Sequence, residues 1–518
     1  MCGQECDLPE GRKPVGLVWK FKYKTKGEYI AKFKARLCVL GNTQTPGIDY
    51  DPENIFAPVM RGSTMRAALA LMGPKGPRRM HVTQADYTLA FLNASPKEKV
   101  YVKSARGFPT DQPNRVLLLL RSLYGLCQSP REWYEYLRAW LREQGFAESK
   151  SDPCMFTRRG KDGQLEVILV YVDDTLIFAS RKELTDEIKK AMRQKFEMTD
   201  VEDADKVIGV ELFRVKGGLC LGQPVYAKMM LEEAGYWDVD TSKLPLNPMS
   251  ENWTHDENSE LLTGAEKEFF VSYLMKIAWM SQQTRIDLAA TASILAQYLS
   301  KPTKSDLAAL RRCLLYLRGS WDDALFYRDS KAGEIIVDLE LEGTPKHDQE
   351  KPGLMFAYAD ASFANEEGRK SRSGQVVMIN GAAIDWASKK QSMVALSSTE
   401  AEYYSVSQVT QSVLHFRKIL TDLDAPITKP IRIYEDNKSC IAIAYKPKHH
   451  GRTKHFDIKA HFIRDHVEKE DVEVIYCPTE LQVADMLTKA LPPVQHQRLK
   501  RFAGMRSLST MEIIKLND

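Results

Sequence analysis

The stretch from Glu166 to Ser180, EVILVYVDDTLIFAS, constrains the fold and chemistry of this chain more than any other. Asp173 and Asp174 stand between two apolar runs rich in β-branched residues, a pattern typical of a β-hairpin with the acids at or beside its turn. Adjacent carboxylates repel each other and are costly to desolvate, so a cation usually neutralises them in apolar surroundings. The alternative is a surface Asp-Asp turn. A metal site would need a further carboxylate from elsewhere in the chain.

The bulk composition is that of a globular protein with several domains. The chain has 518 residues, with 43% hydrophobic and 27% charged residues and a net charge of +4. It contains no apolar run near the roughly 18 residues of a membrane span, and its N-terminus lacks the apolar core of a signal peptide. We therefore expect a cytoplasmic or nuclear protein that is not secreted, with its nine cysteines reduced.

Two short motifs resemble those of copia-type reverse transcriptases. Tyr171-Val172-Asp173-Asp174 is similar to their YxDD signature, and Asp86–Ala94 resembles their DVxxAFLNG pattern, from which Tyr87 and Ala94 depart. Further landmarks follow in the family's order: Lys34–Leu37, Gly41–Gln44, Phe56–Val59, Gly107–Pro109 and Leu123–Arg131, where Cys127 replaces the family's usual lysine.

This resemblance implies roles for individual residues. Asp86 and Asp173 would hold catalytic metal ions and Asp174 would support them. Phe91 would exclude a 2′-hydroxyl beneath the incoming sugar, although core packing is a compatible alternative. The remaining residues expected to bind substrate are Lys34, Arg36, Gln128 and Tyr171.

A basic N-terminal region precedes these acids. Lys20, Lys22 and Lys24 alternate with aromatic residues, which predicts a strand with one basic face, a turn at Lys26–Glu28 and a second strand over Tyr29–Leu40. The face could simply favour solubility. We favour a fingers hairpin over template and triphosphate, because Lys34 and Arg36 fall within a matched motif.

Between the two halves of the chain, helical periodicity dominates. It predicts helices over Pro130–Gly145, Glu183–Phe196, Gln223–Gly235 and Phe269–Leu317, a strand over Val207–Leu212 with Leu219–Gln223 as its partner, and a linker over Leu244–Thr263. Asp287 is interpreted as an ion-pairing or capping residue.

After Pro352 a second set of strands delivers acids, and this region resembles the ribonuclease H domain of copia-type elements, including its WxSKKQ and ALSSTEAEY motifs. The resemblance implies the metal ligands Asp360, Glu402, Asp436 and Asp485. Glu400 competes with Glu402, because residues two apart on a helix cannot face the same ions. A last helix is expected to begin at Gln482–Lys489, and five clustered histidines from His449 to His466 are expected not to bind zinc.

The sequence therefore predicts an α+β chain: a right-hand polymerase with fingers, palm and thumb, followed by an α/β ribonuclease H-like domain. We expect it to copy RNA into DNA with Mg²⁺, for which Mn²⁺ could substitute, and to cleave RNA in RNA–DNA hybrids. The expected partners are RNA template, DNA or RNA primer, dNTPs, and the integrase and capsid segments of a parent polyprotein. The alternative is an inactive or domesticated nucleic-acid-binding relic.

The expected domain limits are fingers and palm at 1–215, thumb and connection at 216–330, a linker at 331–352, the nuclease domain at 353–500 and a tail at 501–518.

Overall fold

The computed structural model describes residues 2–26, 29–73, 79–112, 114–201, 204–329, 354–445 and 457–514. They form two compact units: the first contains Met1–Met60 and Val82–Asp203, and the second contains Arg61–His81 and Ala204–Asp518. The first unit thus ends near the expected palm–thumb border, while a short segment after Met60 belongs to the second unit. The expected linker at 331–352 and the turn at Gly27 and Glu28 lie outside the described residues. The domain limits given above stay predictions.

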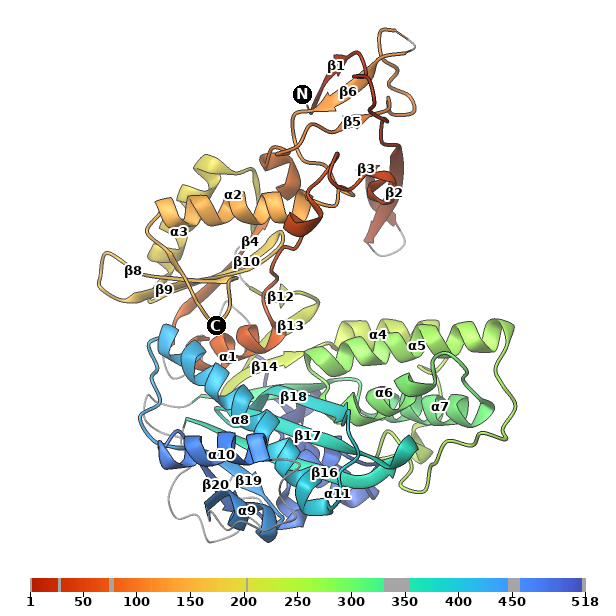
Figure 1. The fold of residues 1–518 in the computed structure, drawn as a ribbon, viewed down its shortest axis with the longest axis vertical. Helices are drawn as coiled ribbons and strands as arrows, with labels where there is room; N and C mark the ends of the chain where they lie inside the picture. The colour runs from red at the N-terminus through yellow and green to blue at the C-terminus, as the bar shows by residue number, and fades with distance from the viewer. Residues whose placement is uncertain are drawn as a thin grey trace. The chain divides into compact units, whose positions relative to one another are not determined.

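The first unit is built on a six-stranded sheet in the order β11-β4-β10-β9-β8-β7 (Figure 1). Strand β4 (His81–Tyr87) lies between β11 (Met198–Val201) and β10 (Asp174–Ala179). Beyond β10 come β9 (Leu165–Tyr171), β8 (Met155–Arg159) and β7 (Ala147–Glu148).

Two helices cover this sheet, and both were predicted from their apolar spacing. Helix α2 (Ser129–Glu143) buries Trp133, Leu137 and Leu141, and the chain leaves it at Gly145 with a φ of 84° that glycine accepts without strain. Helix α3 (Lys182–Lys195) buries Ile188 and Met192. Their aromatic and aliphatic faces form the hydrophobic core beneath the strands.

The basic N-terminal region forms the predicted hairpin. Strands β2 (Leu17–Lys26) and β3 (Tyr29–Val39) pair antiparallel as a separate two-stranded ribbon, with Lys20 opposite Arg36 and Lys22 opposite Lys34. A small sheet of β1 (Gly3–Cys6), β6 (Val116–Leu119) and β5 (Tyr101–Val102) belongs to the same unit.

The second unit begins with a sheet in the order β12-β13-β14-β15-β21. The single strand predicted over Val207–Leu212 is wrong. A two-residue turn at Ile208 and Gly209, with φ values of 50° and 74°, separates β12 (Lys206–Val207) from β13 (Val210–Val215). The turn is hidden in an apolar run, and only Gly209 could have signalled it. The remaining strands are β14 (Gly218–Gly222), β15 (Asp323–Arg328) and β21 (Met505–Ser507), so part of the expected C-terminal tail is a strand of this sheet.

A bundle of helices packs beside this sheet, where the predicted helix over Gln223–Gly235 appears as α4 (Pro224–Glu233). The region expected to be helical throughout, Phe269–Leu317, is mostly helical but is divided into α5 (Gly264–Gln283), α6 (Ala289–Leu295) and α7 (Lys304–Gly319). The break after α5 contains the buried pair of Arg285 and Asp287, whose Nη2 and Oδ2 atoms are 2.7 Å apart. The predicted ion-pairing role of Asp287 is confirmed.

The third sheet has the order β18-β17-β16-β19-β20 and mixes both pairing directions. Strands β16 (Met355–Glu366), β17 (Lys370–Ile379) and β18 (Ala382–Lys390) are antiparallel, whereas β16, β19 (Ile431–Glu435) and β20 (Val472–Tyr476) are parallel. Helix α8 (Ser398–Asp422) crosses this sheet, and α10 (Asp457–Glu468) packs against α8 (Figure 1). Ser397 caps α8 by accepting a hydrogen bond from the Glu400 backbone N–H.

The end of the chain differs from the prediction in one respect. Residues Val483–Leu487 form a 3₁₀ turn, η10, and the last α-helix is α11 (Pro493–Phe502). The Gln482 side chain accepts a hydrogen bond from the Ala484 N–H and donates to the carbonyls of Ala359 and Tyr434. These bonds hold η10 against the ends of β16 and β19, which local helix propensity could not reveal. No described helix is long and apolar enough to cross a membrane.

Candidate active sites

The Asp-Asp pair lies where the sequence predicted it. Strands β9 and β10 pair with Tyr171 opposite Asp174, so Val172 and Asp173 form the turn and Asp174 is the first residue of β10. Val172 has a φ of 55°, an unfavourable value for a β-branched residue. The indole N–H of Trp133 donates a 2.7 Å hydrogen bond to the Val172 carbonyl and so holds the turn against helix α2.

Asp86 stands on the neighbouring strand. Strand β4 borders β10, and the Tyr87 N–H donates to the Asp173 carbonyl at 3.2 Å. The Gln84 side chain donates to Asp174 Oδ1 at 2.9 Å. Burial raises the pKa of Asp174, and the charges of Asp173 and Asp86 raise it further. Asp86, Asp173 and Asp174, called here the hairpin acids, therefore share one electrostatic environment.

Tyr124 connects two predicted substrate residues to the hairpin acids. The Arg36 guanidinium lies 5.5 Å from the centre of the Tyr124 ring, and the Phe91 ring packs edge-on against it at 4.7 Å. Burial raises the pKa of Tyr124, and Asp173 raises it further while Arg36 opposes the shift. Tyr124 was recognised only as part of a motif, and its contacts give it a positioning role that the motif alone did not assign.

Gln128 lies inside the first unit. Its side chain is buried and accepts a hydrogen bond from Gln44 Nε2 at 3.1 Å while donating to the Asp49 carbonyl at 3.0 Å. Both functional groups of the amide are thus engaged in joining loops ahead of α2. These bonds give Gln128 a structural role, and its predicted substrate contact stays a prediction. Tyr171 lies half-buried at the end of β9, and Lys34 shares a face of β3 with Arg36.

A second acid group forms on the third sheet. Ligand atoms of Asp360, Glu402 and Asp436 all lie within 4.8 Å of one another, and they are the sole such group of three among the described residues. The register of β16 and β19 pairs Tyr358 with Tyr434, so Asp360 within β16 and Asp436 just after the end of β19 are both two residues further along. Helix α8 brings Glu402 to the same point. The hairpin acids are therefore less tightly gathered than this group.

Asp485 completes the set predicted from the motifs, called here the buried acids: Asp360, Glu402, Asp436 and Asp485. It lies on η10, forms an ion pair with Lys489, and raises the pKa of Asp360. Burial is the larger cause of that shift, which takes the pKa of Asp360 to about 7. Thr488 Oγ1 donates to Asp360 Oδ2 at 2.6 Å, and Thr479 Oγ1 donates to Asp436 Oδ2 at 2.7 Å.

Glu400 and Glu402 have different environments. The Glu400 carboxylate accepts a 2.7 Å hydrogen bond from the Leu396 N–H, so it fixes the loop ahead of α8. Glu402 instead faces the other acids, and its Oε2 atom is buried without a hydrogen-bond partner. The geometry therefore favours Glu402 as the helical ligand.

Glu435 is a further carboxylate that the motifs did not indicate as a site residue. It is fully buried at the end of β19, and burial raises its pKa well above the ordinary value, with Asp360 and Asp436 adding to the shift. Its Oε1 atom accepts from the Asn437 N–H at 3.0 Å, and its Oε2 atom has no hydrogen-bond partner. Its position directly before Asp436 was the available signal.

The donor set of the buried acids fits a hard divalent cation. Burial raises the pKa of Asp360, Glu402 and Asp485, which means that their negative charges are poorly compensated by the protein. Lys489 contacts the set through its ion pair with Asp485. Carboxylate oxygens without other partners are ligands that Mg²⁺ and Mn²⁺ accept.

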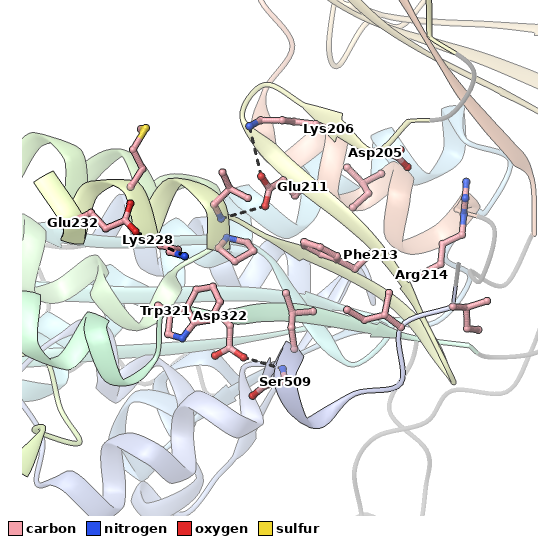
Figure 2. Close-up of a pocket in the computed structure, with 17 residues that line it drawn as sticks. Asp205, Lys206, Glu211, Phe213, Arg214, Lys228, Glu232, Trp321, Asp322 and Ser509 are labelled. Carbon is pink, nitrogen blue, oxygen red and sulfur yellow. Dashed lines mark hydrogen bonds and ion pairs between the residues drawn. The ribbon is translucent and has the colours of Figure 1, made fainter. Parts of the chain in front are cut away.

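Two other features lie outside both acid groups. An open apolar groove of about 1100 Å³ in the second unit runs between β13, α4 and the C-terminal segment, with Phe213, Trp321 and Ser509 along its walls (Figure 2). It contains none of the hairpin or buried acids. Of the clustered histidines, His466 lies 2.8 Å from Asp471 and neither it nor His461 belongs to a metal group, while His449, His450 and His455 lie outside the described residues.

Comparisons with known proteins agree with these motifs. Residues 4–248 match the family described as "Reverse transcriptase (RNA-dependent DNA polymerase)". The Pol polyprotein from transposon TNT 1-94 of Nicotiana tabacum is 31% identical over 97% of this chain and 36% of its own length. That from transposon RE2 of Arabidopsis thaliana is 33% identical over 95% of this chain and 32% of its own length. The Ty1-BL Gag-Pol polyprotein of Saccharomyces cerevisiae is 26% identical over 93% of this chain and 26% of its own length.

Solved structures were also compared. A foamy viral protease-reverse transcriptase in complex with double-stranded DNA aligns with a TM-score of 0.45 and 10% identity over 92% of this chain and 67% of that chain. A ribonuclease H1 in complex with an RNA/DNA hybrid aligns over 26% of this chain and 93% of its own chain, with a TM-score of 0.21 and 17% identity.

The chain spans about a third of the length of the plant relatives it matches. From its matched family and relatives, the chain belongs to the copia-type Pol polyproteins and corresponds to their reverse transcriptase and ribonuclease H-like region.

Proposed function

We propose that this chain is an active RNA-directed DNA polymerase that also cleaves the RNA strand of RNA–DNA hybrids. The observation that carries the proposal is the presence of separate carboxylate groups on two sheets, one in each compact unit. Two-metal phosphoryl transfer requires carboxylates that converge from different elements. Asp360, Glu402 and Asp436 converge on one point, and the hairpin acids stand on two adjacent strands of one sheet. Both sets match the family motifs.

In the polymerase site, the hairpin acids would hold the metal ions. Asp86 and Asp173 would hold Mg²⁺ and Asp174 would support them, while the Gln84 side chain fixes the Asp174 carboxylate through its 2.9 Å hydrogen bond. Bound ions would promote attack by the primer 3′-hydroxyl and neutralise charge on the triphosphate. Lys34 and Arg36 position phosphate groups without reading sequence, and Arg36 is oriented by its contact with the Tyr124 ring. Phe91 blocks the position of a 2′-hydroxyl.

In the nuclease site, the buried acids would likewise hold the metal ions. Asp360, Glu402 and Asp436 form the core of the ion site, and Asp485 joins them from η10. Thr488 and Thr479 fix the orientation of Asp360 and Asp436 by donating hydrogen bonds. The residues before Asp485, Pro478–Leu481, include no histidine that could move a proton there. We propose that the hybrid is bound through its backbone and shape.

The proposed partners are RNA template, primer, dNTPs and the resulting hybrid, together with other segments of a parent polyprotein. Residence in the cytoplasm or the nucleus stays a prediction. The competing proposal is a nucleic-acid-binding relic without catalysis. All seven acids implied by the motifs are present, which supports the active enzyme.

Primer extension on an RNA template with Mg²⁺ distinguishes these proposals. We expect the chain to extend a DNA primer, and Asp173→Asn to abolish extension, because the amide retains the shape but loses the anionic metal ligand. Asp205→Asn, a change at an acid outside both groups, serves as the matched control. Binding of template–primer without any extension, in Mg²⁺ or Mn²⁺, would support the relic instead.

A further inference from the structure

The turn between β9 and β10 has a backbone conformation that its sequence does not favour. Val172 has a φ of 55°, in the left-handed region that a β-branched residue enters only at a cost in free energy. Asp173 follows it directly and Asp174 begins β10, so the directions of both carboxylates depend on this turn. Such a conformation persists only where the surrounding structure holds it.

Packing of the Val172 side chain supplies little of that support. An apolar cavity of about 440 Å³ lies against the turn, and Val170, Val172, Trp133 and the segment 55–59 are among its walls. A side chain that lines a cavity lacks packing partners on that side. The apolar surroundings of the turn therefore do not by themselves fix the backbone of Val172.

Trp133 on helix α2 supplies a direct support. Its indole N–H donates a 2.7 Å hydrogen bond to the Val172 carbonyl. The Trp133 side chain is 1% exposed, and its ring packs edge-on against Tyr87 at 5.1 Å and Phe196 at 5.6 Å. Because these neighbours fix the ring, its N–H is a donor in a fixed position, and the carbonyl that it binds is fixed as well.

The same ring contacts the strand that carries Asp86. Tyr87 follows Asp86 on β4, and its backbone N–H donates to the Asp173 carbonyl at 3.2 Å. Trp133 thus touches the residue after Asp86 and the residue before Asp173. One side chain from helix α2 is therefore linked to both strands of the polymerase site.

We propose that Trp133 is a positioning residue of the polymerase site, whose N–H holds the Val172 conformation and thereby places Asp173 relative to Asp86. The inference rests on the proposed polymerase function, which makes these carboxylates metal ligands. The free energy of one hydrogen bond is comparable with the cost of a positive φ, so loss of the bond is enough to release the turn. A phenyl ring could fill the same core, but it could not donate this bond.

Trp133→Phe removes the donor and keeps an aromatic ring. We expect the maximal rate of single-nucleotide extension on an RNA template to fall about five- to tenfold, which is the size of effect that one lost hydrogen bond produces. Affinity for template–primer, measured without divalent ions, should stay unchanged. Hybrid cleavage by the same preparation should also stay unchanged, because the buried acids belong to the second unit.

Two further variants separate the hydrogen bond from packing. Trp140→Phe shortens another ring that packs against Phe196, at 5.3 Å, and should keep most of the extension rate. Asparagine accepts a positive φ at lower cost than valine, so the turn of Val172→Asn needs less help from the indole. Trp133→Phe should therefore cause a much smaller loss when it is added to Val172→Asn than when it is added to the wild type. Equal losses in the two backgrounds would overturn the proposal, and so would an unchanged rate in Trp133→Phe.

Hydrogen exchange at the turn gives a reading that does not require catalysis. Trp133→Phe should speed exchange of the Tyr87 N–H, which bonds to the Asp173 carbonyl, and Val172→Asn should restore its protection. A wild-type chain that does not extend primers would contradict the proposed function, while this exchange would still test the role of Trp133. Exchange that is unchanged in Trp133→Phe would overturn the inference even if the wild-type chain is an active polymerase.

Discussion

The hairpin acids and the buried acids are assembled in different ways. The first stand at a turn and on an adjacent strand, all half-buried, and burial raises the pKa of Asp174 among them. The second come from two parallel strands, a helix and a 3₁₀ turn, and Asp360, Glu402 and Asp485 are at most 6% exposed. Burial raises the pKa of Asp360 to about 7 and that of Glu402 well above its ordinary value, whereas Lys489 opposes the rise at Asp485.

This difference indicates how each site depends on its ligands. Asp360, Glu402 and Asp436 are already close enough to share an ion, so their mutual repulsion is present in the folded protein before a metal binds. The hairpin acids are only half-buried, and the positive charge of Arg36 lies on the Tyr124 ring near Asp173. We infer that the nuclease site is preformed, whereas the polymerase site is completed by the nucleotide and its ions.

The largest effects should come from removing one ligand at each site. Asp436→Asn removes an anionic ligand with almost no change in volume, so hybrid cleavage should fall by at least about 100-fold while primer extension persists. Asp173→Asn should have the reverse effect. Both activities would be measured on one hybrid substrate. Loss of both activities in either variant would contradict the separation of the two acid groups.

Replacing either of two glutamates on helix α8, Glu402 or Glu400, should give the next largest difference in hybrid cleavage. Glu402→Gln should abolish hybrid cleavage, because its carboxylate is one of the three that converge. Glu400→Gln should only weaken cleavage, since an amide oxygen can still accept the hydrogen bond from the Leu396 N–H. Single-turnover cleavage rates would decide the matter, and equal or reversed losses would show that Glu400 is the ligand.

A change at the polymerase site should have a moderate effect on selectivity. Phe91→Ala removes the ring that packs against Tyr124, and it should raise ribonucleotide incorporation about tenfold or more relative to deoxyribonucleotides. Incorporation of each sugar opposite the same template base gives the ratio. Phe91→Tyr keeps the ring and is the control. An unchanged ratio would make Phe91 a packing residue.

The sequence predicted elements with strong local patterns. The β9–β10 hairpin, helices α2, α3, α4 and α8, and the acids on β4, β16 and β19 could all be located, because apolar periodicity and motif residues coincide there. Glu402 could be preferred over Glu400 from its motif.

The failures have a common cause, because each depends on tertiary contacts. The Ile208–Gly209 turn lies within an apolar run, the break after α5 is held by the buried Arg285–Asp287 pair, and η10 is fixed by Gln482 bonds to other strands. Glu435 shows the same limit, since its burial and its carboxylate oxygen without a hydrogen-bond partner appear only after folding.

The smallest expected effect concerns stability, and it sharpens the comparison of the two acid groups. Folding raises the pKa of Asp360 from 3.8 to about 7, so the folded protein favours the protonated carboxyl. This contribution to stability is fully present below about pH 4 and is lost as the pH rises through about 7. In chelator, the free energy of unfolding of the second unit should therefore decrease by on the order of a few kcal/mol across this range. Thermal melting with and without Mg²⁺ would measure it, and Mg²⁺ should restore most of the loss near pH 8 because it compensates the ionised acids.

Asp360→Asn should flatten the pH dependence of stability, whereas Asp173→Asn should leave it unchanged. A wild-type profile that is flat in chelator would show that the buried acids are compensated within the protein, and the contrast between the two groups would then be lost.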